Sequence, residues 1–207
     1  MYRKEENKKV ILLNNIGYGA QEYLRKIKPD IQTMAYIPSR SDFGKVYYKR
    51  VTETYAELVK NFIYCDLEKN NSEKIMKLIF SSDAIFLAGG DECFILKTML
   101  TNRMKDKFEN YLKKGGLIIG LCAGAEVLSQ DIILVEESKK KGKIISLDYG
   151  LQLIDFVVFP RYDSMVNKNS VIEYCKKTNK KIILMGQNSC VVLDGEKMSK
   201  EGDVEII

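Results

Sequence analysis

Residues 115–125 read GGLIIGLCAGA, and the fold is built around them. The apolar run 117–119, closed by Gly120, predicts a short strand that is buried on both faces. Residues 120–124 then match the pattern G-x-nucleophile-x-G, in which Cys122 holds the nucleophile position. A residue in such a turn is strained, so its neighbours two positions away on either side must be small. This stretch therefore predicts a nucleophile elbow between a strand and a helix.

The helix expected from Ala123 to about Ser129 bears on the chemistry of Cys122. The first N–H groups of a helix and its dipole favour negative charge on a side chain at its start. We therefore expect a lowered pKa for the Cys122 thiol. The alternative is that the glycines and a buried cysteine only let a helix pack closely on a strand, because such short motifs recur by chance.

Strands and helices alternate through the first two-thirds of the chain. The expected strands are 10–13, 31–37, 62–67, 83–88, 117–119, 131–135, 143–147, 181–185 and 190–193, and Asp194-Gly195 predicts a hairpin turn. The expected helices are 20–27, 47–61, 73–80, 93–100, 102–113, 123–129 and 171–175. The alternation predicts an α/β fold, a three-layer sandwich with a mainly parallel sheet and helices on both faces. No linker or repeat interrupts it, so we expect one domain over residues 1–207.

Length and charge narrow the class of protein. The 207 residues suffice for a sizeable core, and no apolar run approaches the length of a membrane span. The charged start is followed by only the short apolar run 10–13, which is too short for a signal peptide, so a cytoplasmic location and no membrane partner are expected. The net charge is +5, but lysines alternate with acids and 139–141 is the only tight basic run. Nucleic acid is therefore not an expected partner.

Histidine is absent from the chain, and this excludes whole classes of chemistry. A Ser-His-Asp or Cys-His-Glu triad needs an imidazole, which this single chain does not supply. The five cysteines are odd in number and show no C-x-x-C spacing, so neither a metal site nor any other cofactor is expected. Apart from Cys122, the cysteines have apolar surroundings in sequence and are expected to fill the core: Cys65, Cys93, Cys175 and Cys190.

A second glycine-rich turn closes the expected strand 83–88. Gly89-Gly90 allows a tight bend that presents backbone amides to a ligand at the carboxyl end of a parallel strand. Asp91 follows directly and is a candidate ligand-binding residue. Asp91 and Glu92 equally suit the first turn of the next helix, where acids complement the helix dipole.

Three stretches in the same order resemble one family. They are the diglycine loop 88–91, the elbow 120–125, and the run from Gly150-Leu151 to 159–163, which reads FPRYD. Together they are similar to the peptidase E and cyanophycinase family of serine peptidases, over about residues 9–195. The resemblance implies a class I glutamine amidotransferase-like fold.

The resemblance also implies roles for individual residues. The family's serine nucleophile matches Cys122, and its histidine base, in a Pro-His-Tyr-like context, matches Arg161. A later acidic position matches Gln187, and the amides of the oxyanion hole match Gly90 and Ala123. The binding parts are thus kept, whereas the parts that transfer protons are changed.

These changes bear on activity. Arginine stays protonated near neutral pH, so Arg161 is a poor base and a poor acid, although it stabilises a thiolate. We therefore expect weak or absent dipeptidase activity, with a small peptide or carboxylate as ligand. Two alternatives remain open on the same fold: a non-enzymatic module that binds small anions, and a redox or electrophile-reactive cysteine. The sequence determines neither the oligomeric state nor whether Arg161 faces Cys122.

Overall fold

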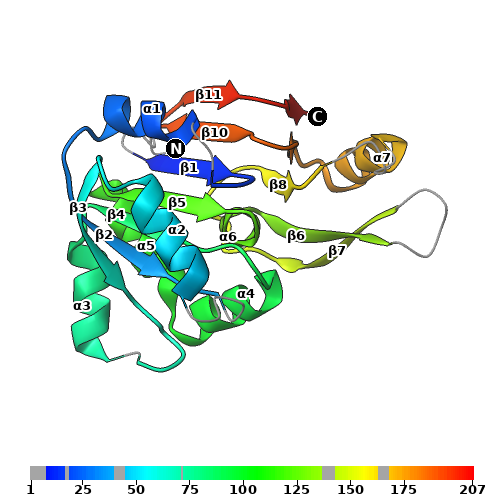
Figure 1. Cartoon of the computed structure of the whole chain (residues 1–207). Helices are drawn as coiled ribbons and strands as arrows, with labels where there is room; N and C mark the ends of the chain where they lie inside the picture. Colours follow the sequence, from blue (N-terminus) through cyan, green and yellow to red (C-terminus); the bar gives the residue numbers. More distant parts are fainter. Residues whose placement is uncertain (1–7, 17–18, 40–44, 71, 137–142, 163–167) are drawn as a thin grey trace.

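A seven-stranded sheet forms the centre of the computed structural model, which describes residues 8–16, 19–39, 45–70, 72–136, 143–162 and 168–207 (Figure 1). In spatial order its strands are β11 (Lys197–Glu201), β10 (Cys190–Asp194), β1 (Lys9–Leu13), β5 (Leu117–Leu121), β4 (Ala84–Leu87), β2 (Ile31–Ile37) and β3 (Val59–Tyr64). The neighbouring strands β1, β5, β4, β2 and β3 are parallel, and β10 and β11 add an antiparallel edge next to β1.

The register of the parallel strands brings three carboxyl ends to one edge. Leu13 at the end of β1 pairs with Leu121 at the end of β5, and Leu87 of β4 pairs with Gly120. All three strands are apolar and buried almost throughout, as expected when helices cover both faces of a parallel sheet. The loops after β1, β4 and β5 therefore meet at this edge, where ligands bind in open α/β sheets.

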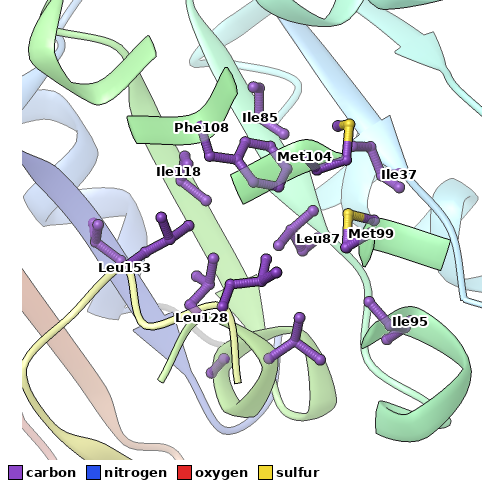
Figure 2. Close-up of a cluster of buried hydrophobic side chains, with 14 of the residues drawn as sticks. Ile37, Ile85, Leu87, Ile95, Met99, Met104, Phe108, Ile118, Leu128 and Leu153 are labelled. Atoms are coloured by element: carbon purple, nitrogen blue, oxygen red, sulfur yellow. The ribbon is translucent and has the colours of Figure 1, made fainter. Parts of the chain in front are cut away.

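Helices cover both faces of the sheet. One face packs on α1 (Gly19–Ile27) and α2 (Val46–Thr54), and the other on α3 (Glu73–Ser81), α4 (Glu92–Thr101), α5 (Met104–Lys113) and α6 (Ala123–Leu128). Figure 2 shows the second of these cores, in which Phe108 of α5 lies near Ile85 of β4 and Ile118 of β5, and Met99 of α4 lies near Leu87 of β4. The molecule is thus a single-domain three-layer α/β sandwich with a mainly parallel sheet, as predicted.

A smaller sheet carries the segment that reaches the site. It consists of β12 (Val204–Ile206), β9 (Ile182–Met185) and β8 (Val157–Pro160), and α7 (Lys168–Thr178) packs on it through Val171 and Tyr174. Strands β6 (Asp131–Glu136) and β7 (Lys143–Tyr149) form a two-stranded ladder that extends away from the body (Figure 1). Because β8 ends at Pro160, Arg161 begins the loop that follows it.

The structure corrects the expected helix 47–61, which ends at Thr54. Tyr55 is buried and continues the helical spacing of apolar residues, but Val59 pairs with Ile31 in the parallel ladder. Strand β3 therefore starts at Val59 instead of residue 62. The short strands β11 and β12 were not predicted; β11 is largely exposed and is held through its backbone ladder to β10. The predicted hairpin turn between β10 and β11 is confirmed, with Gly195 at φ 59°.

The cysteines expected in the core divide into two groups. Cys65 and Cys190 are buried, Cys175 is half-buried, and Cys93 is exposed, which contradicts the expectation for Cys93. Cys93 lies in the first turn of α4, whose buried positions are Ile95, Leu96 and Met99. The lysine run 139–141 and Asp163 lie outside the described residues. In the described part of the chain, no helix has both the length and the apolar character needed to cross a bilayer.

Candidate functional site

Cys122 occupies a strained turn between β5 and α6. Its backbone angles are φ 49° and ψ −111°, a combination that side chains rarely adopt. The Cys122 N–H donates to the Leu13 carbonyl at 2.7 Å, and the Cys122 carbonyl accepts from the N–H groups of Ala125 and Glu126 at 2.8 and 3.1 Å. These bonds tie the turn to β1 and to α6, so the surrounding structure holds the strained residue in place.

The glycines on either side of Cys122 are required by close packing. A Cβ atom on Gly120 would lie 2.8 Å from the Ala125 backbone, and one on Gly124 would lie 2.5 Å from the Leu87 carbonyl oxygen. Both distances are far below an ordinary van der Waals contact. Gly120 lets α6 approach β5, and Gly124 lets α6 approach the end of β4, as the elbow motif predicts.

A pocket of about 570 Å³ opens in front of Cys122. It lies at the carboxyl edge of the sheet and is walled by α2, by the loops after β1 and β4, by the elbow, and by the residue after β8. The lining residues are Asn14, Asn15, Ile16, Tyr47, Arg50, Glu53, Thr54, Gly89, Gly90, Leu121, Cys122 and Arg161. Among the described residues that line it, the charged side chains are two arginines and one glutamate, which together carry a single excess positive charge.

Arg161 lines the same pocket as Cys122, and its charge acts to lower the pKa of the Cys122 thiol. Its backbone has φ 60°, and its N–H donates to the Oδ1 atom of Asn14 at 2.9 Å. The Nδ2 atom of Asn14 donates in turn to the Gly186 carbonyl at 2.7 Å. Asn14 is buried and therefore clamps the Arg161 backbone to the end of β1. The guanidinium remains largely exposed, with a side-chain exposure of 61%.

The expected lowering of the Cys122 pKa is wrong. Burial raises the pKa of the thiol, and this effect outweighs the positive charge of Arg161 and the hydrogen bond from the Ala123 backbone, both of which lower it. The negative charges of Glu126 and Glu92 raise it further. Desolvation disfavours a charged thiolate more strongly than one cation and one amide favour it. Cys122 is thus a neutral thiol near neutral pH.

Glu126 is the residue of the site that sequence reasoning missed. Its side chain is 2% exposed, its Oε1 atom lies 4.0 Å from Nη2 of Arg161, and its Oε2 atom is buried with no hydrogen-bond partner among the described residues. Burial, reinforced by Glu92, raises the pKa of Glu126 from its ordinary value near 4.5 to about 8, although Arg161 opposes this. The signal in the sequence was an acid in the otherwise apolar run 123–128, four positions after Cys122 and so on the same helix face.

The remaining candidates occupy different places. Gly90 lines the pocket with φ 138°, a conformation that favours glycine, and Ala123 is buried with its backbone directed to the Cys122 thiol. The carboxylate of Asp91 accepts from the Phe94 N–H at 2.8 Å and caps α4, outside the pocket lining. Gln187 is exposed in the turn after β9 and is also outside that lining.

No metal-binding arrangement accompanies this pocket. Across the described ranges, no three His, Cys, Asp or Glu side chains are grouped so that they would hold a metal ion. The reactive and charged groups at the pocket are one thiol, the buried carboxyl group of Glu126, Glu53 and two arginines.

Comparison with known sequences identifies relatives of similar length. The family model described as peptidase family S51 matches residues 15–200. An uncharacterised peptidase from Listeria innocua is 24% identical over 177 residues, which cover 82% of this chain and 84% of the relative. Peptidase E from Nostoc sp. is 24% identical over 179 residues, which cover 79% of this chain and 69% of that protein.

Solved structures share the fold. The crystal structure of a candidate peptidase E protein from Listeria monocytogenes superimposes with a TM-score of 0.69 at 19% identity, over 94% of this chain and 98% of the other. A peptidase from an acI-B1 actinobacterium gives a TM-score of 0.75 at 14% identity, over 99% of this chain and 92% of the other. At such identities the likeness shows a common architecture.

Proposed function

The chain belongs to peptidase family S51, and we propose that it uses the pocket in front of Cys122 to bind small peptides or other carboxylate ligands, with slow or no peptide hydrolysis. One observation carries this proposal. A strained turn holds Cys122 at the pocket, and the residue that the end of β8 adds to the pocket lining is Arg161. A chain without histidine keeps the binding geometry and lacks the usual proton carrier.

Slow hydrolysis follows from the protonation states. The nucleophile of a thiol peptidase is the thiolate, and burial raises the pKa of Cys122. Attack would form an S–C bond to the peptide carbonyl carbon, and breaking the C–N bond would require a proton for the departing amine. Arg161 carries a fixed charge at neutral pH and neither accepts nor donates that proton. The usual contribution of general acid–base catalysis is thus missing at this position.

Binding of a carboxylate follows from the charges of the pocket. Arg50 and Arg161 line it together with Glu53, and Gly90 contributes exposed backbone. A guanidinium offers paired N–H donors that match the two oxygens of a carboxylate. The alternative of a redox-sensing cysteine is less well supported, because such thiols need a low pKa and burial shifts the pKa of Cys122 in the opposite direction.

Two measurements test the proposal together. Succinate, used as a probe carboxylate, is expected to raise the Tm of the wild-type protein and of R25A, because Arg25 lies in an exposed ion pair with Glu57. R161A is expected to lose this effect. With aspartyl dipeptides, kcat/KM is expected to fall far below the usual enzyme range of about 10⁴–10⁸ M⁻¹s⁻¹. Turnover within that range that C122A abolishes would show an active peptidase and contradict the proposal.

A further inference from the structure

The buried carboxyl group of Glu126 has no role in the function proposed above. We propose that Glu126 controls how strongly the pocket attracts an anion. In its protonated form it leaves Arg161 to hold a carboxylate beside Cys122, and in its ionised form it engages Arg161 and repels that carboxylate. This inference rests on the proposed function and deepens it, since it makes anion binding depend on one proton.

The geometry places Glu126 behind the arginine of the pocket. Nη2 of Arg161 lies 4.0 Å from the Oε1 atom of Glu126, and the same arginine lines the pocket with Cys122. At this separation the pair is in charge contact but too far apart for a hydrogen bond. Because its side chain is 61% exposed, Arg161 has room to turn between Glu126 and a ligand. Arg161 is therefore shared between an internal carboxyl group and the ligand space.

Because Glu126 is buried, a negative charge on its carboxyl group acts strongly on the groups around it. Its Oε2 atom has no partner among the described residues, so an ionised carboxylate there is poorly compensated. The charged or titratable groups that act on it are Arg161 after β8, Glu92 on α4, and the Cys122 thiol before α6. Of the other described charged side chains on the adjoining elements, Asp131 of β6 is paired with Lys180 at 2.6 Å and Lys97 of α4 is exposed. Arg161 is thus the cation that ionised Glu126 would draw in.

The pH at which the change occurs follows from this environment. Burial and the charge of Glu92 raise the pKa of Glu126 to about 8. Below that pH the carboxyl group is neutral and one positive charge of the pocket is uncompensated. Above it, the negative charge of Glu126 cancels the effect of Arg161 on an incoming anion. The anion preference of the pocket therefore falls as the pH rises through about 8.

Competition between two alkylating reagents at Cys122 measures this preference without a known ligand. Iodoacetate carries a carboxylate and iodoacetamide is neutral, and with each the thiolate attacks the CH₂ carbon, an S–C bond forms and iodide leaves. Both reagents need the same thiolate, so the ratio of carboxymethyl to carbamidomethyl product, read by mass spectrometry of the Cys122 peptide, is independent of the thiol pKa. The exposed Cys93 supplies an internal reference in every sample.

In the wild-type protein the ratio at Cys122, relative to Cys93, is expected to fall about fivefold between about pH 6.5 and pH 9.5. E126Q is expected to keep a high ratio at all pH values, and R161A a low one. E92Q removes a charge that raises the pKa of Glu126, so its transition is expected at lower pH than that of wild type. This variant changes a half-buried side chain on α4 and provides a test that does not depend on the folding of E126Q.

The outcomes separate the two proposals. The role of Glu126 is overturned if the product ratio at Cys122 does not change with pH in the wild-type protein, or if E126Q or E92Q has the same pH dependence as wild type. This holds whether or not succinate raises the Tm. If the ratio behaves as expected but succinate fails to stabilise the protein, Glu126 controls the local charge and the carboxylate-binding function is wrong. If succinate stabilises the protein and the ratio is flat, the function stands without this control.

Discussion

The turn that holds Cys122 and the turn that holds Arg161 both have positive φ values, 49° and 60°, yet they are built differently. The Cys122 turn is fixed by three backbone hydrogen bonds and by flanking glycines, where a Cβ atom would lie less than 3 Å from neighbouring backbone, all within the central three-layer body. The Arg161 turn follows a strand of the smaller sheet and reaches the site through Asn14. The shape of the elbow thus comes from the backbone of the large sheet, whereas Arg161, one of the two arginines in the pocket lining, is delivered by the small one.

The shape of the pocket and part of its charge therefore depend on different regions of the structure. A substitution in the first turn should damage the fold, whereas one in the second should change the chemistry of a pocket that remains formed. The four predictions that follow test this division, from the largest expected effect to the smallest.

G124A is expected to be the most damaging change. Its Cβ would lie 2.5 Å from the Leu87 carbonyl oxygen, so α6 must move away from β4 at a cost of about 3 kcal/mol. G115A is the matched control: its Cβ meets nothing within 4 Å, and only the positive φ of 81° costs about 1 kcal/mol. Urea unfolding of both variants measures the difference. Equal losses of stability would show that close packing does not govern the elbow.

E126Q is expected to be more stable than wild type at about pH 9, by roughly 3 kcal/mol. The pKa of Glu126 is raised to about 8 in the folded state, so the unfolded chain loses this proton first as the pH rises. The wild-type protein therefore loses stability as the pH rises from about 4.5, the ordinary pKa of the carboxyl group, to about 8. The E126Q substitution removes that loss. E57Q, an exposed position, should show no such gain in urea unfolding at high pH. A stability difference that is independent of pH would rule out a buried proton at Glu126.

N14A is expected to lose about 2 kcal/mol, because it leaves the Arg161 N–H without its acceptor and removes one of two donors to the Gly186 carbonyl, which keeps the Ser189 hydroxyl. The stabilising effect of succinate should disappear as well, since the clamp on Arg161 is gone. N61A removes an exposed bond to the Gln32 carbonyl, outside the pocket lining, and is the control, with a change near zero. Thermal unfolding with and without succinate reads both effects. Retention of the succinate effect in N14A would show that Arg161 is placed by other contacts.

R161A is expected to have the smallest effect on stability, below about 0.5 kcal/mol, because its guanidinium is mostly exposed. It removes the charge that lowers the pKa of Cys122, so that pKa rises further. Iodoacetamide labelling of Cys122 should therefore reach half its maximal rate at a higher pH in R161A than in wild type. A shift in the opposite direction would show that the guanidinium does not act on the thiol.

The fold and the shape of the site were predictable because they depend on local rules. The alternation of strands with helices predicts the sandwich, which the structure confirms, and the small residues around Cys122 suit the tight turn found there.

The errors concern properties that only tertiary structure determines. The prediction of a lowered pKa for Cys122 took account of the helix end and of Arg161. The desolvation that dominates the pKa depends on what packs around the thiol. Glu126 was missed because a single acid in the apolar run 123–128 does not reveal that its side chain is buried. The helix expected over 47–61 followed apolar spacing past Thr54, where pairing of Val59 with β2 takes precedence.

The contacts of Asn14 bear on the order in which the parts of the site come together during synthesis. Its side chain and backbone join the end of the first strand to Arg161, to Gly186 and, through its N–H, to the Ser189 carbonyl. A growing polypeptide that has emerged only as far as α6 already contains the elbow, but not the clamp that brings a cation to it. Arg161 therefore reaches the elbow only once residues 161–189 have been made and have packed against the end of β1.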